Sequence, residues 1–282
     1  MNADDFGLTS GVNRAILRLN QLGRLSSATL MAVAEATTEA GSIAQNAPNL
    51  GVGCHIVLVD GIPALRVEQL PTLVNQATGR FRSTLGQFVK DLFLGRIRES
   101  EIQAEAEAQI ARICALGLTP THIDTHKHTH MFPQVLQPML QAARHKGIPS
   151  IRNPFEPIWS LNATFGAPLI RRLQVQVLNR FRPSFHRMVD KSGLLTTNGA
   201  IGVLATGTLD ARTLNALLGA LPNGTWELVT HPGYYDADLG NARTRLLASR
   251  ETELEALANL PLAADAELIH FGQLAATSRR PT

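Results

Sequence analysis

Four of the nine histidines of the chain lie between residues 121 and 130, in the segment Thr-His-Ile-Asp-Thr-His-Lys-His-Thr-His. Neutral imidazole is the commonest protein ligand for metal ions and also carries protons near neutral pH. In an extended strand, side chains at positions of the same parity share one face. The metal-capable residues of the segment all occupy even positions: His122, Asp124, His126, His128 and His130. The pattern predicts a strand that carries a metal or proton-transfer site. The alternative is a solvated polar loop.

A pair of carboxylates near the start of the chain is a second candidate. Asp4 and Asp5 are adjacent in an apolar, glycine-containing setting. Like charges in such a setting raise each other's pKa unless a cation or hydrogen bonds compensate them, so we expect one of them to meet a metal ion. The residues that follow also predict a helix capped by Thr9 or Ser10. Both interpretations are compatible if the aspartates end a strand just before the helix.

Two single histidines complete the candidate set. His55 interrupts the apolar run 51–59. Taken alone, such a histidine is more often a hydrogen-bonded core residue than a ligand, but the other motifs favour a ligand. His231 follows the predicted strand 226–230, where a strand turns into a loop. Polar residues at the carboxyl ends of parallel strands are where α/β folds carry their sites.

Composition limits the class of protein. With 282 residues, of which 44% are hydrophobic, we expect one domain covering 1–282. The net charge is only +3, and Lys and Arg are scattered, which indicates that nucleic acid is not a partner. Cys54 and Cys114 form no disulfide framework; both are expected to be small buried residues of a cytoplasmic protein. No apolar run approaches the roughly 18 residues of a transmembrane segment.

Strands and helices alternate along the chain, which predicts a mostly parallel α/β fold. Strands are predicted at 26–33, 51–59, 121–130, 148–152, 226–230 and 266–271, and helices at 12–22, 34–47, 99–116, 134–146, 210–221 and 243–260. The segment 60–95 has no clear periodicity and is predicted to be a lid or insertion. The segment 159–183 is basic and amphipathic; we expect a solvated surface helix, with membrane-surface binding as the alternative.

Four motifs, in this order, resemble the YdjC-type carbohydrate deacetylases over nearly the whole chain. They are Asn2-Ala3-Asp4-Asp5-Phe6-Gly7, Gly53-Cys54-His55-Ile56-Val57-Leu58, the segment 122–130 with Pro133, and Thr230-His231-Pro232-Gly233. Four other segments are similar to the branch associated with hopanoid biosynthesis rather than to the chitooligosaccharide branch. These are Asp60-Gly61, Gly79-Arg80-Phe81, His126-Lys127-His128 and the loop 152–157.

The resemblance implies an irregular (β/α) TIM-like barrel of the glycoside hydrolase/deacetylase type, with one divalent metal ion, Mg²⁺ or Zn²⁺. It implies that Asp5, His55 and His126 are the ligands, that Asp4 is the base beside the attacking water, and that His231 faces the metal. From its residue type, we expect His231 to be partly protonated near neutral pH and to act as the acid. Members usually have a few apolar residues before the first motif, so we expect either a truncated start or a stunted first strand here.

The expected activity is hydrolysis of the N-acetyl group of an amino sugar, either soluble or lipid-linked. The alternatives are a metal-dependent hydrolase of another amide or a phosphoester, and a noncatalytic sugar-binding barrel. We expect Asp124 to orient a ligand histidine, and His128 and His130 to bind substrate or tune the site. His122 and Lys127 are expected to be structural, and Arg152 to contact either a sugar or a salt-bridge partner. A homodimer and a peripheral membrane location are compatible with the sequence.

Overall fold

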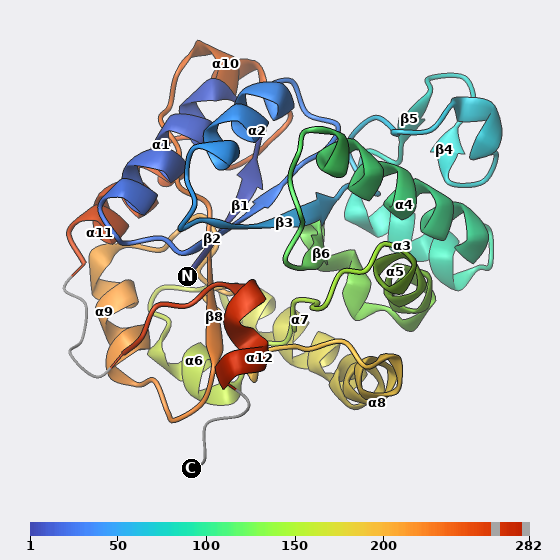
Figure 1. Ribbon diagram of the computed structural model, residues 1–282. Coiled ribbons are helices and arrows are strands. Elements are labelled where there is room, and N and C mark those ends of the chain that lie inside the picture. Colours follow the sequence, from blue (N-terminus) through green and yellow to red (C-terminus); the bar gives the residue numbers. More distant parts are fainter. Residues whose placement is uncertain (261–265, 278–282) are drawn as a thin grey trace.

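A six-stranded parallel sheet forms the centre of the computed structural model, which describes residues 1–260 and 266–277 (Figure 1). The strand order is β6-β3-β2-β1-β8-β7. The strands are β1 (Asn2–Phe6), β2 (Ser27–Leu30), β3 (Gly51–Ile56), β6 (Ile123–Thr125), β7 (Gly199–Ile201) and β8 (Trp226–Thr230). The sheet is curled and open, so the predicted irregular (β/α) barrel with mostly parallel strands is confirmed.

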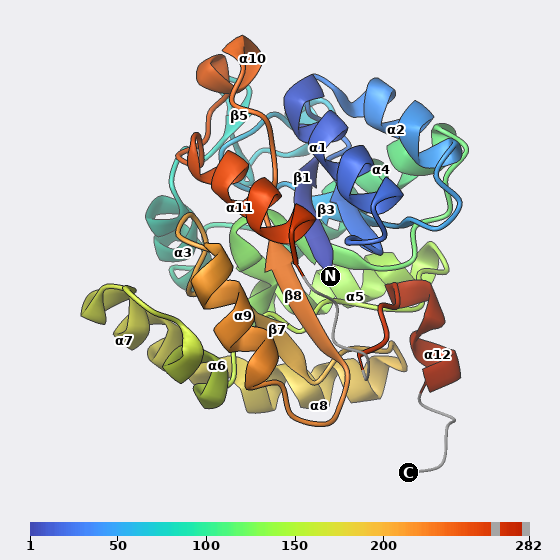
Figure 2. The same cartoon turned by 90° about the vertical axis from the view of Figure 1, so that its left-hand side faces the viewer.

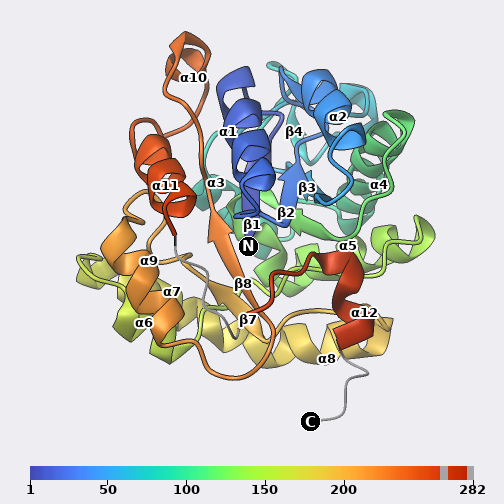
Figure 3. The same cartoon turned by 60° about the vertical axis from the view of Figure 1, so that its left-hand side comes forward.

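Helices surround the outer side of the curled sheet (Figures 2 and 3). They are α1 (Ser10–Gln21), α2 (Thr37–Gln45), α3 (Leu85–Phe93), α4 (Glu99–Ala115), α5 (Pro133–His145), α6 (Ile158–Ala163), α7 (Leu169–Leu178), α8 (Arg182–Ser192), α9 (Ala211–Gly219), α10 (Ala237–Asn241), α11 (Ser249–Ala258) and α12 (Leu274–Thr277). The Thr9 side chain caps α1 by accepting a hydrogen bond from the Val12 backbone nitrogen. The aspartate pair therefore ends a strand and the cap follows it, as the sequence predicted.

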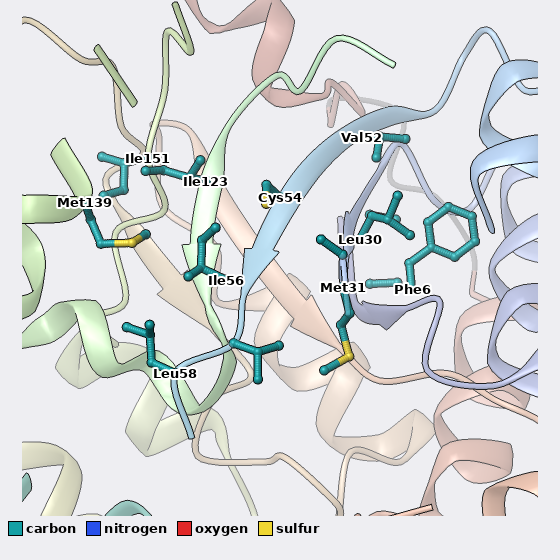
Figure 4. Close-up of a cluster of buried hydrophobic side chains, with 14 of the residues drawn as sticks. Phe6, Leu30, Met31, Val52, Cys54, Ile56, Leu58, Ile123, Met139 and Ile151 are labelled. Carbon is teal, nitrogen blue, oxygen red and sulfur yellow. The ribbon is translucent and has the colours of Figure 1, made fainter. Parts of the chain in front are cut away.

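The apolar side chains of the strands pack in a buried cluster. Figure 4 shows Cys54 and Ile56 of β3 in this cluster with Leu30 of β2 and Ile123 of β6. His55 lies between Cys54 and Ile56, so its side chain leaves the opposite face of β3. Cys54 is fully buried as predicted, whereas Cys114 is exposed at the end of α4, contrary to prediction.

The first strand is not stunted. β1 has five residues and pairs with β2 on one side and β8 on the other. The segment 60–95 contains a small hairpin, β4 (Val74–Asn75) with β5 (Arg80–Phe81), and helix α3. Its role as a lid stays a prediction. The single domain over 1–282 also stays a prediction, and residues 261–265 and 278–282 lie outside the described structure.

The predicted strand over 121–130 is wrong beyond Thr125. Only Ile123–Thr125 pair with β3, and a 3₁₀ segment, η2 (His126–Met131), follows. Lys127 (φ 60°) and His128 (φ 52°) lie in the left-handed region, which L-residues rarely adopt. Alternation of faces therefore stops at the end of β6, and the histidines after it do not share one face.

The following predicted elements also differ from the structure. Residues 266–270 form no strand; a 3₁₀ turn follows at η4 (Phe271–Gln273), and the Phe271 ring stacks on His122 at 3.8 Å instead of joining the sheet. The strand at 148–152 is reduced to isolated bridges of Ser150 and Ile151. The last long helix starts at Ser249 rather than 243.

Candidate metal centre and active site

The backbone at the end of β1 allows two adjacent carboxylates to reach one site. In a regular strand Asp4 and Asp5 would point to opposite faces. Asp5, however, has φ 63°, in the left-handed region, and the register with β2 shifts between Ala3 and Phe6. Both aspartate side chains are buried and both lie close to His55. A left-handed aspartate is strained, and such strain is often found at functional sites.

Asp5, His55 and His126 present three potential ligand atoms to one point. Oδ1 of Asp5 lies 3.6 Å from Nε2 of His55 and 3.3 Å from Nδ1 of His126, and the two nitrogens are 3.4 Å apart. Ligands at about 2.1 Å from a tetrahedral ion are separated by about 3.4 Å. Oδ1 of Asp5 is buried and accepts no hydrogen bond. This donor set therefore fits one divalent ion.

Asp124 fixes the orientation of the His55 ring. Oδ1 of Asp124 lies 2.8 Å from Nδ1 of His55, which leaves Nε2 directed at Asp5. A carboxylate on the second nitrogen of a ligand histidine is the usual arrangement at metal sites. Burial lowers the pKa of His55, but the carboxylates of Asp124, Asp4 and Asp5 outweigh it and raise the pKa to about 9. A proton on His55 therefore competes with a metal ion.

Arg152 is fully buried and bridges three carboxylates. Its guanidinium donates to both oxygens of Asp4, at 2.6 and 2.8 Å, and to Glu227 at 2.8 Å, and it also contacts Asp124. All three guanidinium nitrogens contact carboxylates of the protein, so Arg152 has the geometry of a salt bridge rather than of a sugar contact. The side chain comes from the loop after the Ile151 bridge, where the sequence placed a rigid polar loop.

Asp4 accepts further hydrogen bonds from Asn2 at 2.9 Å and from Thr29 at 3.2 Å. Burial on its own would raise the pKa of the Asp4 carboxyl, but the positive charges of Arg152, His55 and His231 hold it well below its usual range. Asp4 is therefore ionised. Its Oδ2 lies 3.9 Å from Nε2 of His231, which places a carboxylate and an imidazole side by side.

His231 is held by its backbone rather than by its ring. Its backbone nitrogen donates to Glu253 at 2.6 Å, and Nδ1 of the ring is buried without a hydrogen-bond partner. Burial lowers the pKa of His231 to about 4, although Asp4 and Asp5 oppose the shift. Burial therefore favours the neutral imidazole of His231 and opposes the partial protonation near neutral pH that its residue type suggested.

The structure adds functional candidates that the sequence reading missed: Arg250, Glu253 and Glu227. Arg250 is fully buried on α11 and donates to the second oxygen of Asp5, Oδ2, at 2.6 Å. One signal was available for Glu227. Glu227 lies in β8 with the same parity as His231, which directly follows the strand, so the sequence could have indicated that the two side chains share one face. The sequence offers no comparable signal for Arg250.

The remaining histidines of the 121–130 segment lie outside the three-residue cluster. His130 is buried, with Nδ1 2.7 Å from the Thr125 hydroxyl and Nε2 3.2 Å from the Arg152 backbone oxygen, so it braces the loops around the site. Burial lowers the pKa of His128 to about 3. His122 is stacked on Phe271, and Lys127 pairs with Asp60 at 3.1 Å.

Comparison with known proteins identifies the family. The family model described as "YdjC-like protein" matches residues 1–267. The chain belongs to the YdjC-like family. No helix in the described part of this YdjC-like chain is long and apolar enough to cross a membrane.

Several curated relatives carry names that include an activity. A "Carbohydrate deacetylase" of Thermoanaerobacter pseudethanolicus is 29% identical over 91% of this chain and 89% of its own length. A protein of the same name from Geobacillus stearothermophilus is 40% identical over 53% of this chain and 57% of its own length. A "Chitooligosaccharide deacetylase" of Serratia marcescens is 36% identical over 53% of this chain and 56% of its own length.

A crystal structure of an Enterococcus faecalis V583 protein, described as a "putative cellobiose-phosphate cleavage protein", has the same fold. The TM-score is 0.72 at 24% identity, over 92% of this chain and 89% of the other. At this identity the likeness shows the fold alone.

Proposed function

We propose that this YdjC-like protein is a metal-dependent hydrolase that removes the N-acetyl group from an N-acetylated amino sugar. The observation that carries the proposal is the convergence of Asp5, His55 and His126 at 3.3 to 3.6 Å, with Asp4 and His231 beside them. The names of relatives matched over most of the chain support the same reaction. In this proposal Mg²⁺ or Zn²⁺ is the ion.

The ligand cluster is buried but reachable from outside. The Asp5 and His55 side chains are almost completely covered, whereas that of His126 is 21% exposed, so a substrate approaches from the His126 side. When bound, a divalent ion supplies a Lewis acid for the amide carbonyl and lowers the pKa of water. Arg250 and Asp124 hold Asp5 and His55 in place for that ion.

Asp4 and His231 move the proton. Asp4 takes a proton from the attacking water, but its very low pKa makes it a poor place for the proton to stay. His231, with a pKa of about 4 and Nε2 3.9 Å from Asp4, holds the proton better. In this proposal the water oxygen bonds to the acetyl carbon, its proton reaches His231 by way of Asp4, and His231 donates that proton to the departing nitrogen as the carbon–nitrogen bond breaks. The products are acetate and the free amine.

The proposed substrate is a small or lipid-linked amino sugar. The lipid-linked form and a peripheral membrane location belong to this proposal, as does the relation to the hopanoid-associated branch. His128 lies in η2, two residues after the proposed ligand His126. It is the proposed substrate contact, because Nδ1 of its ring is buried without a hydrogen-bond partner.

Acetate release tests the proposal. N-acetylglucosamine oligosaccharides are incubated with wild-type protein, His126→Ala and a control, His145→Ala, with and without Mg²⁺ or Zn²⁺. His145 is an exposed histidine on α5 that pairs with Glu107. We expect metal-dependent acetate release in the wild type and control, and only the metal-free level in His126→Ala.

Two outcomes contradict the proposal. Metal binding measured by calorimetry without acetate release from any acetylated sugar would favour another amide or a phosphoester as substrate. Sugar binding without metal binding would favour a noncatalytic barrel.

A further inference from the structure

Helix α7 carries large apolar side chains on its outer surface. Leu169, Ile170, Leu173 and Val177 are 78%, 68%, 60% and 53% exposed, and no residue of α7 is buried. Figure 2 shows α7 projecting from the body of the protein. Contiguous exposed apolar side chains on a soluble protein are uncommon and mark interaction surfaces.

The arginines of α7 face the protein. On a solvated surface helix the charged side chains usually face the solvent instead. Arg171 donates to the backbone oxygens of Thr206 and Val203, at 2.9 and 3.3 Å. Arg172 donates to the backbone oxygen of Leu161 at 2.6 Å and also contacts that of Thr164. The two guanidinium groups therefore anchor the helix, and the apolar side chains are left outside. α7 is therefore a surface helix, as predicted, but it is its arginines rather than its apolar side chains that contact the protein.

The end of α3 lies beside the residues that directly follow α7 and beside the residue that directly follows the His126 segment. Phe93 and Leu94 are each about half exposed. The ring of Phe93 lies 5.7 Å from Phe132 and 6.3 Å from Phe181, which follows α7. Phe132 directly follows η2, the segment that begins at His126. We call Phe93, Leu94, Leu169, Ile170, Leu173 and Val177 the apolar face.

The charges of the segment that carries α7 favour one occupant of the apolar face. No aspartate or glutamate occurs from residue 157 to residue 189, whereas the same stretch has five arginines: Arg171, Arg172, Arg180, Arg182 and Arg187. Arg180 and Arg187 are exposed. A second copy docked on this face would bring two cationic rims together. Anionic lipid headgroups would complement the rim while the apolar side chains enter the acyl boundary.

We propose that the apolar face docks on the surface of a bilayer that contains anionic lipid, with α7 lying in the plane of the interface. This deepens the proposed function and rests on it for its purpose: an amino sugar attached to a membrane lipid would then be presented beside the His126 side of the metal cluster. Vesicle binding itself does not depend on catalysis, so the two proposals can fail separately.

Vesicle co-sedimentation tests the docking. Full-length protein is mixed with vesicles of phosphatidylcholine alone or with one-third phosphatidylglycerol, at low and high salt. The test variant is Leu169→Gln with Leu173→Gln. The matched control is Leu22→Gln with Ile62→Gln, two other exposed apolar side chains that do not belong to the apolar face. Arg171 and Arg172 are unsuitable for this test because they anchor α7.

We expect the wild type and control to bind the anionic vesicles, less so at high salt, and the test variant to bind at least tenfold more weakly. Wild-type protein that stays in the supernatant, or equal binding by the test variant, would overturn the proposal. So would a dimer in light scattering that the test variant abolishes, because a second copy would then be the occupant. Acetate release from a soluble oligosaccharide should be unchanged in the test variant; its absence in all proteins, with vesicle binding intact, would refute only the proposed function.

Discussion

Two adjacent aspartates of β1 are each paired with a buried arginine, yet the two pairs differ in what they leave free. Arg152 engages both oxygens of Asp4 and also holds Asp124 and Glu227. Arg250 engages only Oδ2 of Asp5, and Oδ1 accepts no hydrogen bond. Both oxygens of Asp4 therefore accept hydrogen bonds from the protein, whereas Asp5 has one oxygen available to a metal ion.

The difference shows how one strand end provides two chemical roles. A buried charge needs a partner of opposite sign, because desolvation strongly disfavours an isolated ion. For Asp4 the protein supplies that partner completely. For Asp5 the protein supplies a partner for Oδ2 alone, and the proposed ion would be the partner of Oδ1. We therefore infer that Asp4 keeps its geometry with or without metal, while Asp5 depends on metal to complete its surroundings.

Substituting each aspartate separately should give the largest effects. Asp4→Asn should keep metal binding and lower acetate release by about 10²- to 10⁴-fold, the range for losing an acid–base group. Asp5→Asn should weaken metal binding by more than about 100-fold, because losing an outer partner of a ligand alone costs about 10- to 100-fold. Metal calorimetry together with acetate release separates the two. Equal loss of metal binding in both variants would mean that the aspartates share one role.

Replacing each arginine should lower the free energy of unfolding by a different amount. Arg152→Met leaves three buried carboxylates with less compensation, and Arg250→Met leaves one; breaking a buried pair costs about 3–5 kcal/mol. We expect Arg152→Met at or above the top of this range and Arg250→Met at the bottom, measured as the free energy of unfolding in urea.

Metal should then distinguish the two arginine variants. Saturating Mg²⁺ or Zn²⁺ should recover part of the lost stability in Arg250→Met, since the ion faces Asp5, and little in Arg152→Met. The exposed Arg96→Met serves as the control for losing an arginine on the surface. Equal recovery of stability in both variants would contradict the inference that Asp5, and not Asp4, has an oxygen available to the metal ion.

Much of this site was visible in the sequence because its residues interrupt apolar strands. Asp4, Asp5, His55 and His231 stand at or near strand ends, and parallel strands bring their carboxyl ends to one edge. His126 was found for a partly wrong reason. The predicted strand ends at Thr125, and the left-handed backbone of Lys127 and His128 cannot be read from residue type, since glycine, Asn and Asp favour that region but Lys does not.

The buried arginine that pairs with Asp5 was harder to predict from the sequence. Arg250 lies on α11 among Glu251, Glu253 and Glu255, a pattern typical of a solvated helix face. Its burial depends on α11 packing beside the end of β1, 245 residues away in the chain. Likewise, the sequence does not show that the arginines of α7 contact the protein while its apolar side chains face outward. Sequence periodicity shows that a helix has two faces but not which face the protein covers.

The smallest predicted effect concerns the pH dependence of the metal-free protein. The pKa of His55 is raised from 6.5 to about 9 in the folded state by Asp124, Asp4 and Asp5, against the opposite effect of burial. A raised pKa stabilises the folded state fully below pH 6.5, and this contribution disappears as the pH rises through 9. One pKa unit corresponds to about 1.4 kcal/mol, so the loss is at most about 3 kcal/mol.

Urea unfolding in a chelator at pH 6, 7.5 and 9 measures this loss, with His55→Gln as the variant that lacks the titrating group. The wild type should lose stability relative to His55→Gln between pH 6 and 9. Bound metal occupies Nε2 in place of the proton, so the metal-loaded wild type should not show the decline. A decline that persists with metal bound would mean that the ion does not use His55, and that the open oxygen of Asp5 serves another ligand.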